Sequence, residues 1–280
     1  MQAPRRIRRG DGPRTGRRLV VPRVDSIIVA SLVQTTRRPG RRSEEELRAI
    51  YDQRYVDQYD PHAVQRMRRM LPLFELSGRE KVADFGCGSG VLAELISDRV
   101  GEYVGVDFSE AFVREARRRQ AERGTRNATY HCADIVGFCE EHPDEFDAGF
   151  ALDVAEHIYD DQFLRIGRAI HGSLKAGAPL YLHTPNAEYF MERLRDRGVL
   201  PQIEGHVAVR DRARYEALLH ECRFSDVRAR YLPHYLRAAA ALHGLGALPL
   251  VGRHFRARLF LTCRKGARRE SISSAHDSRA

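Results

Sequence analysis

The sequence predicts an α/β fold in which helices pack on both faces of a mostly parallel sheet. Two observations predict this fold. Between residues 81 and 184, short apolar segments typical of buried strands alternate with segments of helical length. The first apolar segment, VADF, leads directly into a glycine-rich loop, GCGSG. Sheets of this kind bind ligands at the carboxyl ends of their strands, so we expect the functional site there.

The positive charge of the chain is concentrated ahead of the predicted fold. The formal net charge is +9, but residues 1–42 hold twelve Arg, two Asp and no Lys. The remaining residues carry 35 basic and 36 acidic side chains and are nearly neutral. We expect a disordered leader over 1–42, a folded domain over 43–265 and a disordered tail over 266–280. A nearly neutral domain argues against a nucleic-acid partner, although the leader has the charge to contact one.

Two helices are expected ahead of the sheet, within residues 43–78. Ser43 and Glu46 form the S-x-x-E pattern of a capping box, which predicts a helix from Ser43 to Tyr59. Pro61 begins a second helix, through Phe74, whose apolar residues recur at core spacing. These helices form an N-terminal extension of the fold.

The segment 79–186 is the expected core, and the segment 187–265 completes the domain. Strands of the core are predicted over 81–85, 103–107, 128–132, 146–152 and 179–184. Helices over 91–99, 109–123, 135–141 and 161–174 connect them. Later helices are predicted over 187–197 and 211–222, and later strands over 227–232 and 258–263. An apolar stretch broken by glycines, residues 233–254, separates the last two strands.

The cysteine and hydropathy patterns exclude several classes of protein. The five cysteines include no C-x-x-C pair, so neither a disulfide framework nor a zinc knuckle is indicated. The sequence contains no run of eighteen apolar residues, so it predicts no membrane span. We expect a cytoplasmic protein, with peripheral membrane association left open. The sequence does not predict its oligomeric state.

The glycine loop is more typical of one ligand than of others. A dinucleotide loop has the pattern G-x-G-x-x-G or G-x-G-x-x-A, but the last of these positions is here Val91. The glycines fall instead at Gly86, Gly88 and Gly90. Asp84 stands two residues before them. A carboxylate so close disfavours a pyrophosphate and favours a cation. S-adenosylmethionine carries an ammonium and a sulfonium and no phosphate, so it is the ligand that we expect.

Acidic residues also follow the next two strands. Asp107 ends the second strand, where a carboxylate accepts hydrogen bonds from both ribose hydroxyls of a nucleoside. Asp134 follows the third strand, where it would accept the adenine amino group beside the apolar face of Ile135. Each acid alone also suits a turn or a helix cap, but three in succession favour a cofactor site. The expected cofactor-binding residues are Asp84, Gly86, Cys87, Gly88, Gly90, Asp107, Phe108, Asp134, Ile135 and Leu152.

The segments DFGCGSG, VGVDFS, HCADI, FDAGFALDVAEHI and LKAGAPLYLHTPN, in this order, resemble class I S-adenosylmethionine-dependent methyltransferases. Within that class the resemblance is to the ubiquinone-biosynthesis O-methyltransferase group, and it covers about residues 66–265. It implies a Rossmann-like sheet of seven strands whose last strand, over 258–263, is antiparallel. It also implies that Arg66, matched by spacing, touches the cofactor carboxylate. Ala178 and Arg223 stand where the class usually has glycine, which indicates a divergent branch with its own substrate.

A general base is expected beside the methyl group, because an oxygen nucleophile must lose its proton. The group that the chain resembles has an E-x-x-E-H segment after strand four, matched here by Asp153, Glu156 and His157. We expect His157 to be the base, oriented by Glu156 or Asp153. The structural alternative is that Glu156 and His157 cap the following helix and form hydrogen bonds with the backbone. A further alternative is a Mg²⁺ or Zn²⁺ site that these three residues form with His206 and that would hold paired substrate hydroxyls.

Three functions remain open from the sequence. The first is O-methylation of a small molecule, such as a quinone precursor or a secondary metabolite. The second is RNA 2′-O-methylation anchored by the Arg-rich leader, because E-x-x-E-H…H arrangements also occur in such enzymes. The third is a non-catalytic module that binds S-adenosylmethionine. The intact loop and the strand-end acids favour an enzyme, and the nearly neutral domain favours a small-molecule acceptor.

Overall fold

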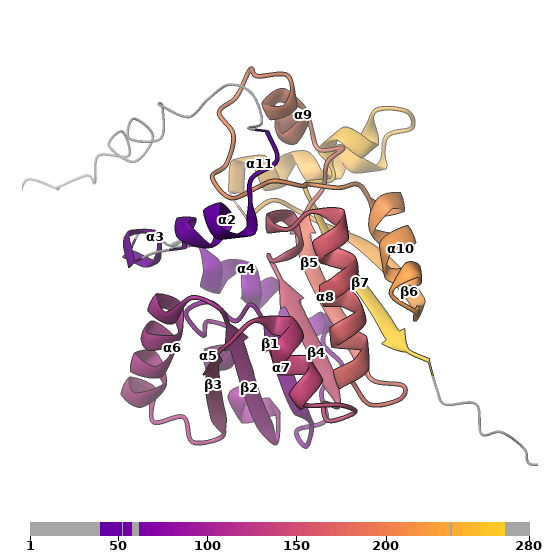
Figure 1. Cartoon of the computed structure of the whole chain (residues 1–280). Coiled ribbons are helices and arrows are strands. Elements are labelled where there is room, and N and C mark those ends of the chain that lie inside the picture. The colour runs from indigo at the N-terminus through magenta and orange to yellow at the C-terminus, as the bar shows by residue number, and fades with distance from the viewer. Residues whose placement is uncertain (1–39, 52, 58–61, 236, 267–280) are drawn as a thin grey trace, which may run out of the picture. The chain divides into compact units, whose positions relative to one another are not determined.

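A computed structural model describes residues 40–51, 53–57, 62–235 and 237–266, all within one unit, Thr35–Ala280. They form a seven-stranded sheet with the order β3-β2-β1-β4-β5-β7-β6 (Figure 1). The strands β1 to β5 pair in parallel, and β7 runs antiparallel to both β5 and β6. This confirms the predicted fold and the antiparallel last strand. The strands are β1 (Lys81–Phe85), β2 (Glu102–Asp107), β3 (Ala128–Cys132), β4 (Ala148–Leu152), β5 (Pro179–Pro185), β6 (Phe224–Leu232) and β7 (Arg258–Lys265).

Helices cover both faces of the sheet, as predicted. Successive side chains of a strand point to opposite faces, so Val82 joins one apolar core and Phe85 the other. The helices that contribute to the core of Val82 are α4 (Ala63–Met70), α5 (Ala93–Ile96) and α6 (Glu110–Arg123). The helices that contribute to the core of Phe85 are α7 (Ile135–Glu141), α8 (Asp160–Ser173) and α10 (Arg212–Glu221).

The N-terminal extension differs from the single long helix that was expected first. It consists of α2 (Glu44–Ile50) and α3 (Gln53–Asp57), separated at Tyr51, whose backbone leaves helical geometry. The capping box is present: Glu46 N donates to Ser43 Oγ over 3.1 Å, and Ser43 N donates to the Glu46 carboxylate. The second helix, α4, ends at Met70, because Pro72 in the following turn η1 (Leu71–Leu73) cannot continue its hydrogen bonding.

Several element boundaries also differ from the expected ones. After the glycine loop, α5 has only four residues and continues as the 3₁₀ turn η2 (Ser97–Arg99). The strand β6 begins at Phe224, three residues early, and shifts register between Ser225 and Arg228. Asp226 has a φ of 50° within that shift, and such a bulge hides the alternating pattern of a strand. The other elements after β4 are η3 (Ala155–His157), α9 (Phe190–Asp196), α11 (Arg237–Ala241), η4 (Leu242–Ala247) and η5 (Gly252–Phe255).

The end of the expected leader belongs to the described domain. Arg41 forms an ion pair with Asp161 at 2.6 Å, and the Arg42 backbone N–H donates to the Tyr159 hydroxyl over 3.0 Å. Residues 1–39 and 267–280 lie outside the described residues, so the predicted disorder there stays a prediction. Within the part of the chain that the structure describes, no helix is long and apolar enough to cross a membrane.

The topology brings four loops to one edge of the sheet. Phe85 at the end of β1 is level with Val106 of β2, and Leu152 at the end of β4 is level with His183 of β5. The strand order reverses between β1 and β4, and sheets of this type bind ligands at such a point. The loops after β1, β2, β4 and β5 therefore surround the candidate site.

Candidate functional site

The loop after β1 is held against β2 and has no room for a side chain at two of its glycines. The backbone N–H groups of Gly86 and Cys87 both donate to the Val106 carbonyl, over 2.8 and 3.1 Å. Gly86 has a φ of 81°, and a Cβ there would lie 2.5 Å from a methyl group of Val154. A Cβ at Gly90, with a φ of 76°, would lie 2.7 Å from the Tyr130 hydroxyl. Both positions therefore require glycine, as the loop motif predicts.

Asp107 is fixed at the end of β2, directly beside that loop. One carboxylate oxygen accepts from Gly88 N over 3.0 Å, and the other accepts from Ser109 N over 2.9 Å. The residue is buried, and burial raises the pKa of its carboxyl against the lowering effect of the two hydrogen bonds. Each oxygen has lone pairs beyond these bonds. This geometry fits the expected pair of ribose hydroxyls.

Asp84 precedes the loop and Cys87 is part of it, and both side chains are buried inside the protein. The Tyr103 hydroxyl donates to the Asp84 carboxyl, and burial raises the pKa of Asp84 to about 7. The charge that the sequence analysis assigned to Asp84 is therefore partly suppressed at neutral pH. Cys87 is buried in the apolar core, which raises the pKa of its thiol well above the ordinary value.

The residues expected around adenine are in contact with the N-terminal extension. Asp134 is the N-cap of α7, where it accepts from Val136 N over 3.0 Å. It also forms an ion pair with Arg48 of α2 at 2.6 Å, and the Arg48 guanidinium lies over the Phe108 ring, 5.0 Å from its centroid. The structural explanation for Asp134, a helix cap, thus holds in this structure. An adenine at this place must displace Arg48 from Asp134 or share that carboxylate with it.

Asp153 is the centre of a buried charge network after β4. It adopts a φ of 57°, which Asp tolerates better than most residues. One carboxylate oxygen accepts from Arg66 Nε over 2.7 Å, and the other lies 2.7 Å from His183 Nδ1. Burial acts to raise the pKa of Asp153, but the charges of Arg66 and His183 hold it well below the ordinary value. Arg66, expected on the cofactor carboxylate, is thus paired with Asp153.

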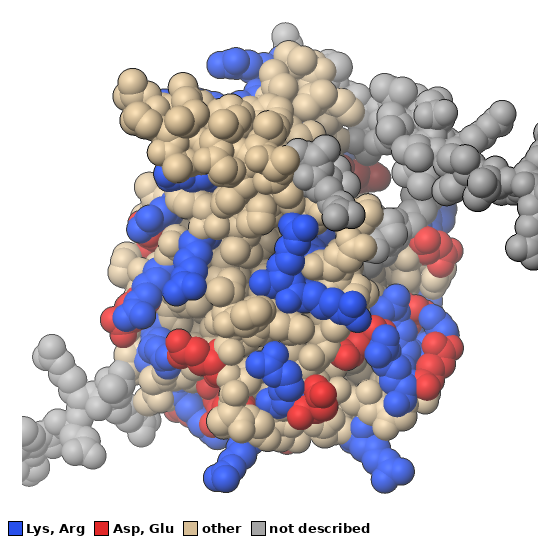
Figure 2. All heavy atoms as spheres, turned by 180° about the vertical axis from the view of Figure 1, so that it is seen from behind, with Lys and Arg blue, Asp and Glu red and all other residues tan. Residues whose placement is uncertain are grey.

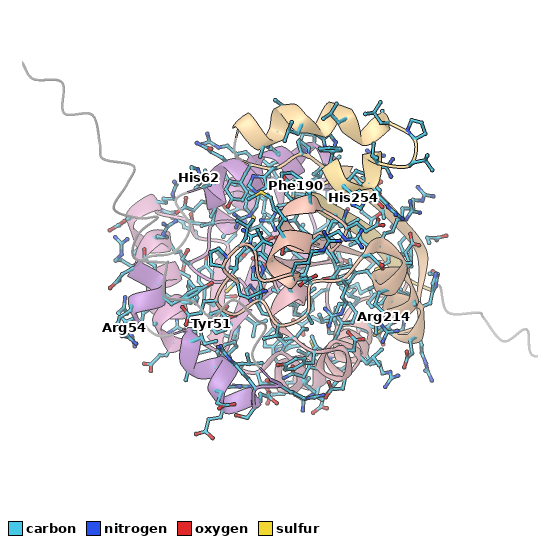
Figure 3. The ribbon with its side chains drawn as sticks, turned by 90° about the horizontal axis from the view of Figure 1, so that it is seen from above. Tyr51, Arg54, His62, Phe190, Arg214 and His254 are labelled. Carbon is cyan, nitrogen blue, oxygen red and sulfur yellow. The ribbon has the colours of Figure 1, made fainter. Side chains whose placement is uncertain are left out.

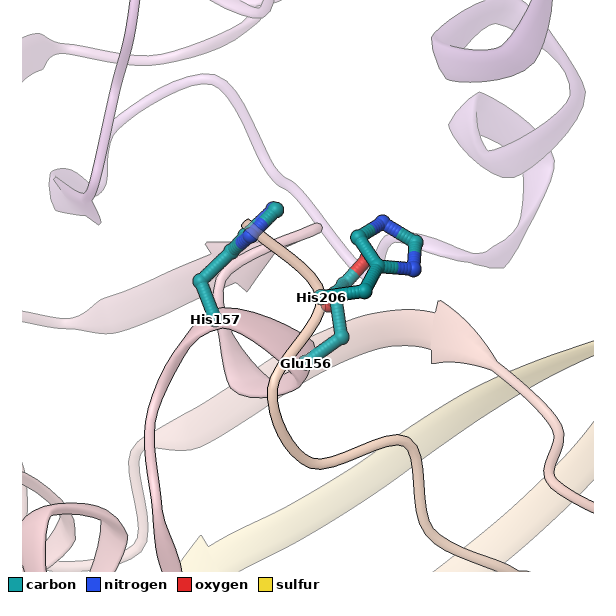
Figure 4. Close-up of side chains that lie close together, drawn as sticks. All are labelled: Glu156, His157 and His206. Carbon is teal, nitrogen blue, oxygen red and sulfur yellow. The ribbon is translucent and has the colours of Figure 1, made fainter. Parts of the chain in front are cut away.

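Glu156, His157 and His206 converge beside this network (Figure 4). Each residue offers one ligand atom, and these three atoms all lie within 4.8 Å of one another. Glu156 and His157 are on η3, and His206 is on the loop before α10. The Glu156 carboxylate accepts from the Thr184 hydroxyl over 3.1 Å, and burial followed by the charge of Asp153 raises its pKa to about 8.

His157 is oriented by the backbone of the same loop as His206. Its Nδ1 lies 3.0 Å from the Gly205 carbonyl oxygen, and burial lowers its pKa. The sequence predicts that Glu156 or Asp153 orients His157, whereas the hydrogen bond at its Nδ1 is to the Gly205 carbonyl. No sequence pattern indicates the role of Gly205, since any residue supplies a carbonyl group.

Three further residues of this region were missed or received no role in the sequence analysis. Thr184 and Tyr215 share a hydrogen bond of 2.9 Å beneath Glu156. Arg258, at the start of β7, lies 3.9 Å from Asp153. In a chain with so many arginines, composition cannot single out Arg258. Leu152 and Ile135, expected near the cofactor, lie at the end of β4 and in the first turn of α7.

The chain is similar to known proteins over this region. Residues 82–177 match the methyltransferase domain family. The ubiquinone biosynthesis O-methyltransferase of Idiomarina loihiensis is 34% identical over 107 residues, which are 38% of this chain and 43% of that protein. The protein of the same name from Pseudomonas fluorescens strain Pf0-1 is 32% identical over 131 residues, 42% of this chain and 55% of that protein. The chain thus spans about half the length of these relatives.

Solved structures share the fold over a longer stretch. The phosphoethanolamine N-methyltransferase 2 of Haemonchus contortus, in complex with S-adenosylhomocysteine, covers 81% of this chain and 61% of its own, with 17% identity and a TM-score of 0.59. The [4+2]-cyclase SpnF covers 73% of this chain with 18% identity and a TM-score of 0.55. A cyclase with this fold shows that the fold alone does not fix the reaction. The glycine loop and the strand-end acid Asp107 both lie within residues 82–177, the stretch that is similar to the methyltransferase domain family.

Proposed function

We propose that this protein transfers a methyl group from S-adenosylmethionine to an oxygen atom of a small-molecule acceptor. The main support for this proposal is the protonation state of His157. The Gly205 carbonyl oxygen only accepts hydrogen bonds, so the Nδ1 atom of His157 bears the proton and Nε2 keeps its lone pair. Because burial lowers the pKa of His157, its imidazole is neutral at neutral pH. A neutral imidazole with an available nitrogen lone pair is suited to remove a proton from a hydroxyl group.

The other residues of the site hold the reactants and exclude water. Asp107 binds the ribose of the cofactor, and the backbone after β1 approaches it closely because Gly86 and Gly90 have no side chains. The cofactor supplies an electrophilic methyl group on a good leaving group, so the main task of the protein is alignment. The Tyr51 ring lies edge-on to the His157 ring, 5.7 Å between centroids, and covers this end of the site.

The names of the similar proteins and the surface charge both support a small acceptor. The relatives found by sequence are O-methyltransferases of ubiquinone biosynthesis. On the face shown in Figure 2, acidic side chains lie among the basic ones below, and the upper part is largely uncharged. A nucleic-acid phosphate backbone is recognised by continuous basic surface, which this face does not offer.

The substitution His157→Gln tests the proposed base. We expect its affinity for S-adenosylhomocysteine to stay unchanged, because His157 is placed at the acceptor. We expect kcat with a catechol acceptor to fall by about 10²-fold, the usual contribution of a general base. His220→Gln, an exposed histidine at the end of α10, is the matched control and should behave as the wild type. A fully active His157→Gln variant would exclude His157 as the base.

A metal ion at Glu156, His157 and His206 is the second mechanism that the geometry favours. The buried Nδ1 of His206 makes no hydrogen bond to the described residues, as expected of a nitrogen kept for a ligand. One carboxylate and two imidazoles are ligands that suit Zn²⁺ better than Mg²⁺, which prefers oxygen. These residues would hold the ion, which would lower the pKa of a bound substrate hydroxyl.

Chelation separates the two mechanisms. If His157 acts as a base without a metal ion, activity on catechol should survive treatment with a chelator. If the cluster holds a metal ion, the chelator should abolish activity and added Zn²⁺ should restore it. Calorimetric titration of Zn²⁺ into the wild type and into His206→Gln gives an independent readout. Equal zinc affinity of the two proteins would argue against this site.

A further inference from the structure

Arg258 carries a largely buried charge, and its guanidinium lies over the Tyr235 ring, 5.7 Å from the ring centroid. It stands at the start of β7, paired with Pro185 at the end of β5, and its side chain is 13% exposed. Its Nε is buried without a hydrogen-bond partner among the described residues. Its nearest anion is Asp153, at 3.9 Å from Nη1, which is too far for a hydrogen bond. Burying a guanidinium without matched acceptors is costly, so this arrangement needs an explanation.

The acids around Arg258 do not neutralise it. Asp153 is already bound by Arg66 and His183, both at 2.7 Å. The Glu156 carboxylate accepts from the Thr184 hydroxyl over 3.1 Å. Among the described residues, neither carboxylate forms a hydrogen bond with Arg258.

A second arginine, on another element, is also mostly buried and also has an Nε without a hydrogen-bond partner among the described residues. Arg195 on α9 is 16% exposed, donates to Glu192 over 2.8 Å and has a buried Nε with no hydrogen-bond partner among the described residues. Burial lowers the pKa of His234, and the charges of Arg258 and Arg195 both add to this effect. Figure 3 shows α9, marked by Phe190, beside η5, marked by His254. The Phe190 ring lies 6.1 Å from the Phe255 ring, which anchors α9 to the segment that leads into Arg258.

We propose that Arg258, supported by Arg195, binds a carboxylate of the methyl acceptor, so that the acceptor is an acidic phenol. This inference rests on the proposed function and names its class of substrate. The planar guanidinium matches a carboxylate through two parallel hydrogen bonds. Because Arg258 lies next to the cluster of Glu156, His157 and His206, it would hold the acid group while the phenol hydroxyl lies at the cluster.

Paired acceptors test this proposal. The wild type should methylate 3,4-dihydroxybenzoate with a kcat/KM at least about 10-fold above that for catechol, which lacks the carboxylate. Arg258→Gln should lower kcat/KM for the acid by about 10²-fold and leave that for catechol nearly unchanged. Arg258→Lys keeps the charge but loses the planar pair of donors. Its kcat/KM for the acid should lie between those of the wild type and Arg258→Gln. The control Arg230→Gln removes an exposed arginine of β6 and should change neither value. Equal losses on both acceptors would overturn the proposal.

Binding measurements separate this proposal from its two alternatives. The cofactor also carries a carboxylate, which is the alternative partner for Arg258. The affinity for S-adenosylhomocysteine is therefore measured in the same variants. Unchanged affinity supports an acceptor site, and a large loss overturns it in favour of the cofactor. Calorimetry of 3,4-dihydroxybenzoate and catechol on the complex with S-adenosylhomocysteine needs no turnover. If 3,4-dihydroxybenzoate binds more tightly than catechol but is not methylated, the anion site is supported and the proposed function is refuted. Equal affinity for the two compounds would refute the anion site.

Discussion

Single residues of this site act through fixed geometry rather than through charge alone. Asp107 shows this most clearly, because its two oxygens are held by Gly88 N and Ser109 N before any ligand binds. The preorganised carboxylate loses little freedom when it accepts the ribose hydroxyls. Its value to the site therefore depends on both oxygens being charged acceptors.

Asp107→Asn should weaken binding of S-adenosylhomocysteine. An amide offers only one accepting oxygen, so one hydrogen bond to a charged group is lost, at a cost of about 2 kcal/mol, or roughly 30-fold in affinity. Isothermal titration calorimetry measures the change. Asp98→Asn, at an exposed aspartate of η2, is the control. Unchanged affinity in Asp107→Asn would contradict the assignment of Asp107 to the ribose.

Glu156 should make stability depend on pH. Its pKa is about 8 in the folded protein, raised by burial and by Asp153 from an ordinary value of 4.5. Between these values the folded chain holds a proton that the unfolded chain has lost. The stability that this group contributes is therefore fully present below the unfolded pKa and is lost as the pH rises through the folded pKa.

Glu156→Gln removes this dependence, because glutamine does not titrate. The free energy of unfolding of the variant, relative to that of the wild type, should increase as the pH is raised from about 5 to about 8. Urea unfolding at several pH values within this range measures it. Glu140→Gln, at an exposed glutamate of α7, should track the wild type. Parallel pH profiles of Glu156→Gln and the wild type would show that Glu156 titrates normally.

At the scale of elements, the packing of α8 on α10 depends on a glycine, which has no side chain. Gly167 lies in the middle of α8, where glycine normally weakens a helix. A Cβ at this position would lie 2.6 Å from Cys222 Sγ, next to the end of α10. Close approach of the two helices thus requires glycine here. At Gly172 of the same helix, a Cβ would meet no atom within 4 Å.

Alanine at these two positions should therefore have opposite effects. Gly172→Ala should stabilise the protein by about 0.5–1 kcal/mol through helix propensity. Gly167→Ala should destabilise it by about 1–3 kcal/mol through overpacking. Chemical denaturation measures both. In combination with Cys222→Ala, which removes the sulfur, Gly167→Ala should cost less than it does alone. Equal effects of the two single alanine variants would disprove the steric argument.

At the scale of the whole molecule, the cofactor links elements that are far apart in the sequence. Its expected partners lie after β1, β2, β3 and β4, and α2 contacts the expected adenine side through the ion pair of Arg48 with Asp134. A ligand that binds only the folded state stabilises all of these elements together.

S-adenosylhomocysteine should therefore raise the melting temperature. At a concentration of about 100 times its Kd, the stabilisation is about 2.7 kcal/mol, which corresponds to a rise of roughly 5–10 °C for a domain of this size. Differential scanning fluorimetry measures the shift. ATP is the matched control, because the loop lacks the dinucleotide pattern and should not bind a polyphosphate. A shift with ATP but not with S-adenosylhomocysteine would overturn the cofactor assignment.

The sequence by itself determined the sheet and the position of the loop, and it predicted the ligand of that loop. Strand alternation, the glycines Gly86 and Gly90, and Asp107 are local patterns, because strand burial, positive φ angles and strand-end acids depend on neighbours in the chain. The capping box at Ser43 was predictable for the same reason. Helix ends were less predictable, since Tyr51 breaks the first helix without a glycine or a proline.

Only the tertiary structure decided which side chains meet around the reaction. It paired Arg66 with Asp153, turned His157 to the Gly205 carbonyl and left Arg258 Nε without a hydrogen-bond partner among the described residues. These residues are separated by up to nearly two hundred positions, and charge or side-chain type does not reveal which partner each one finds. The physical reason is burial: inside the protein each charge must take the nearest compatible partner, and only the packed fold determines which partner that is.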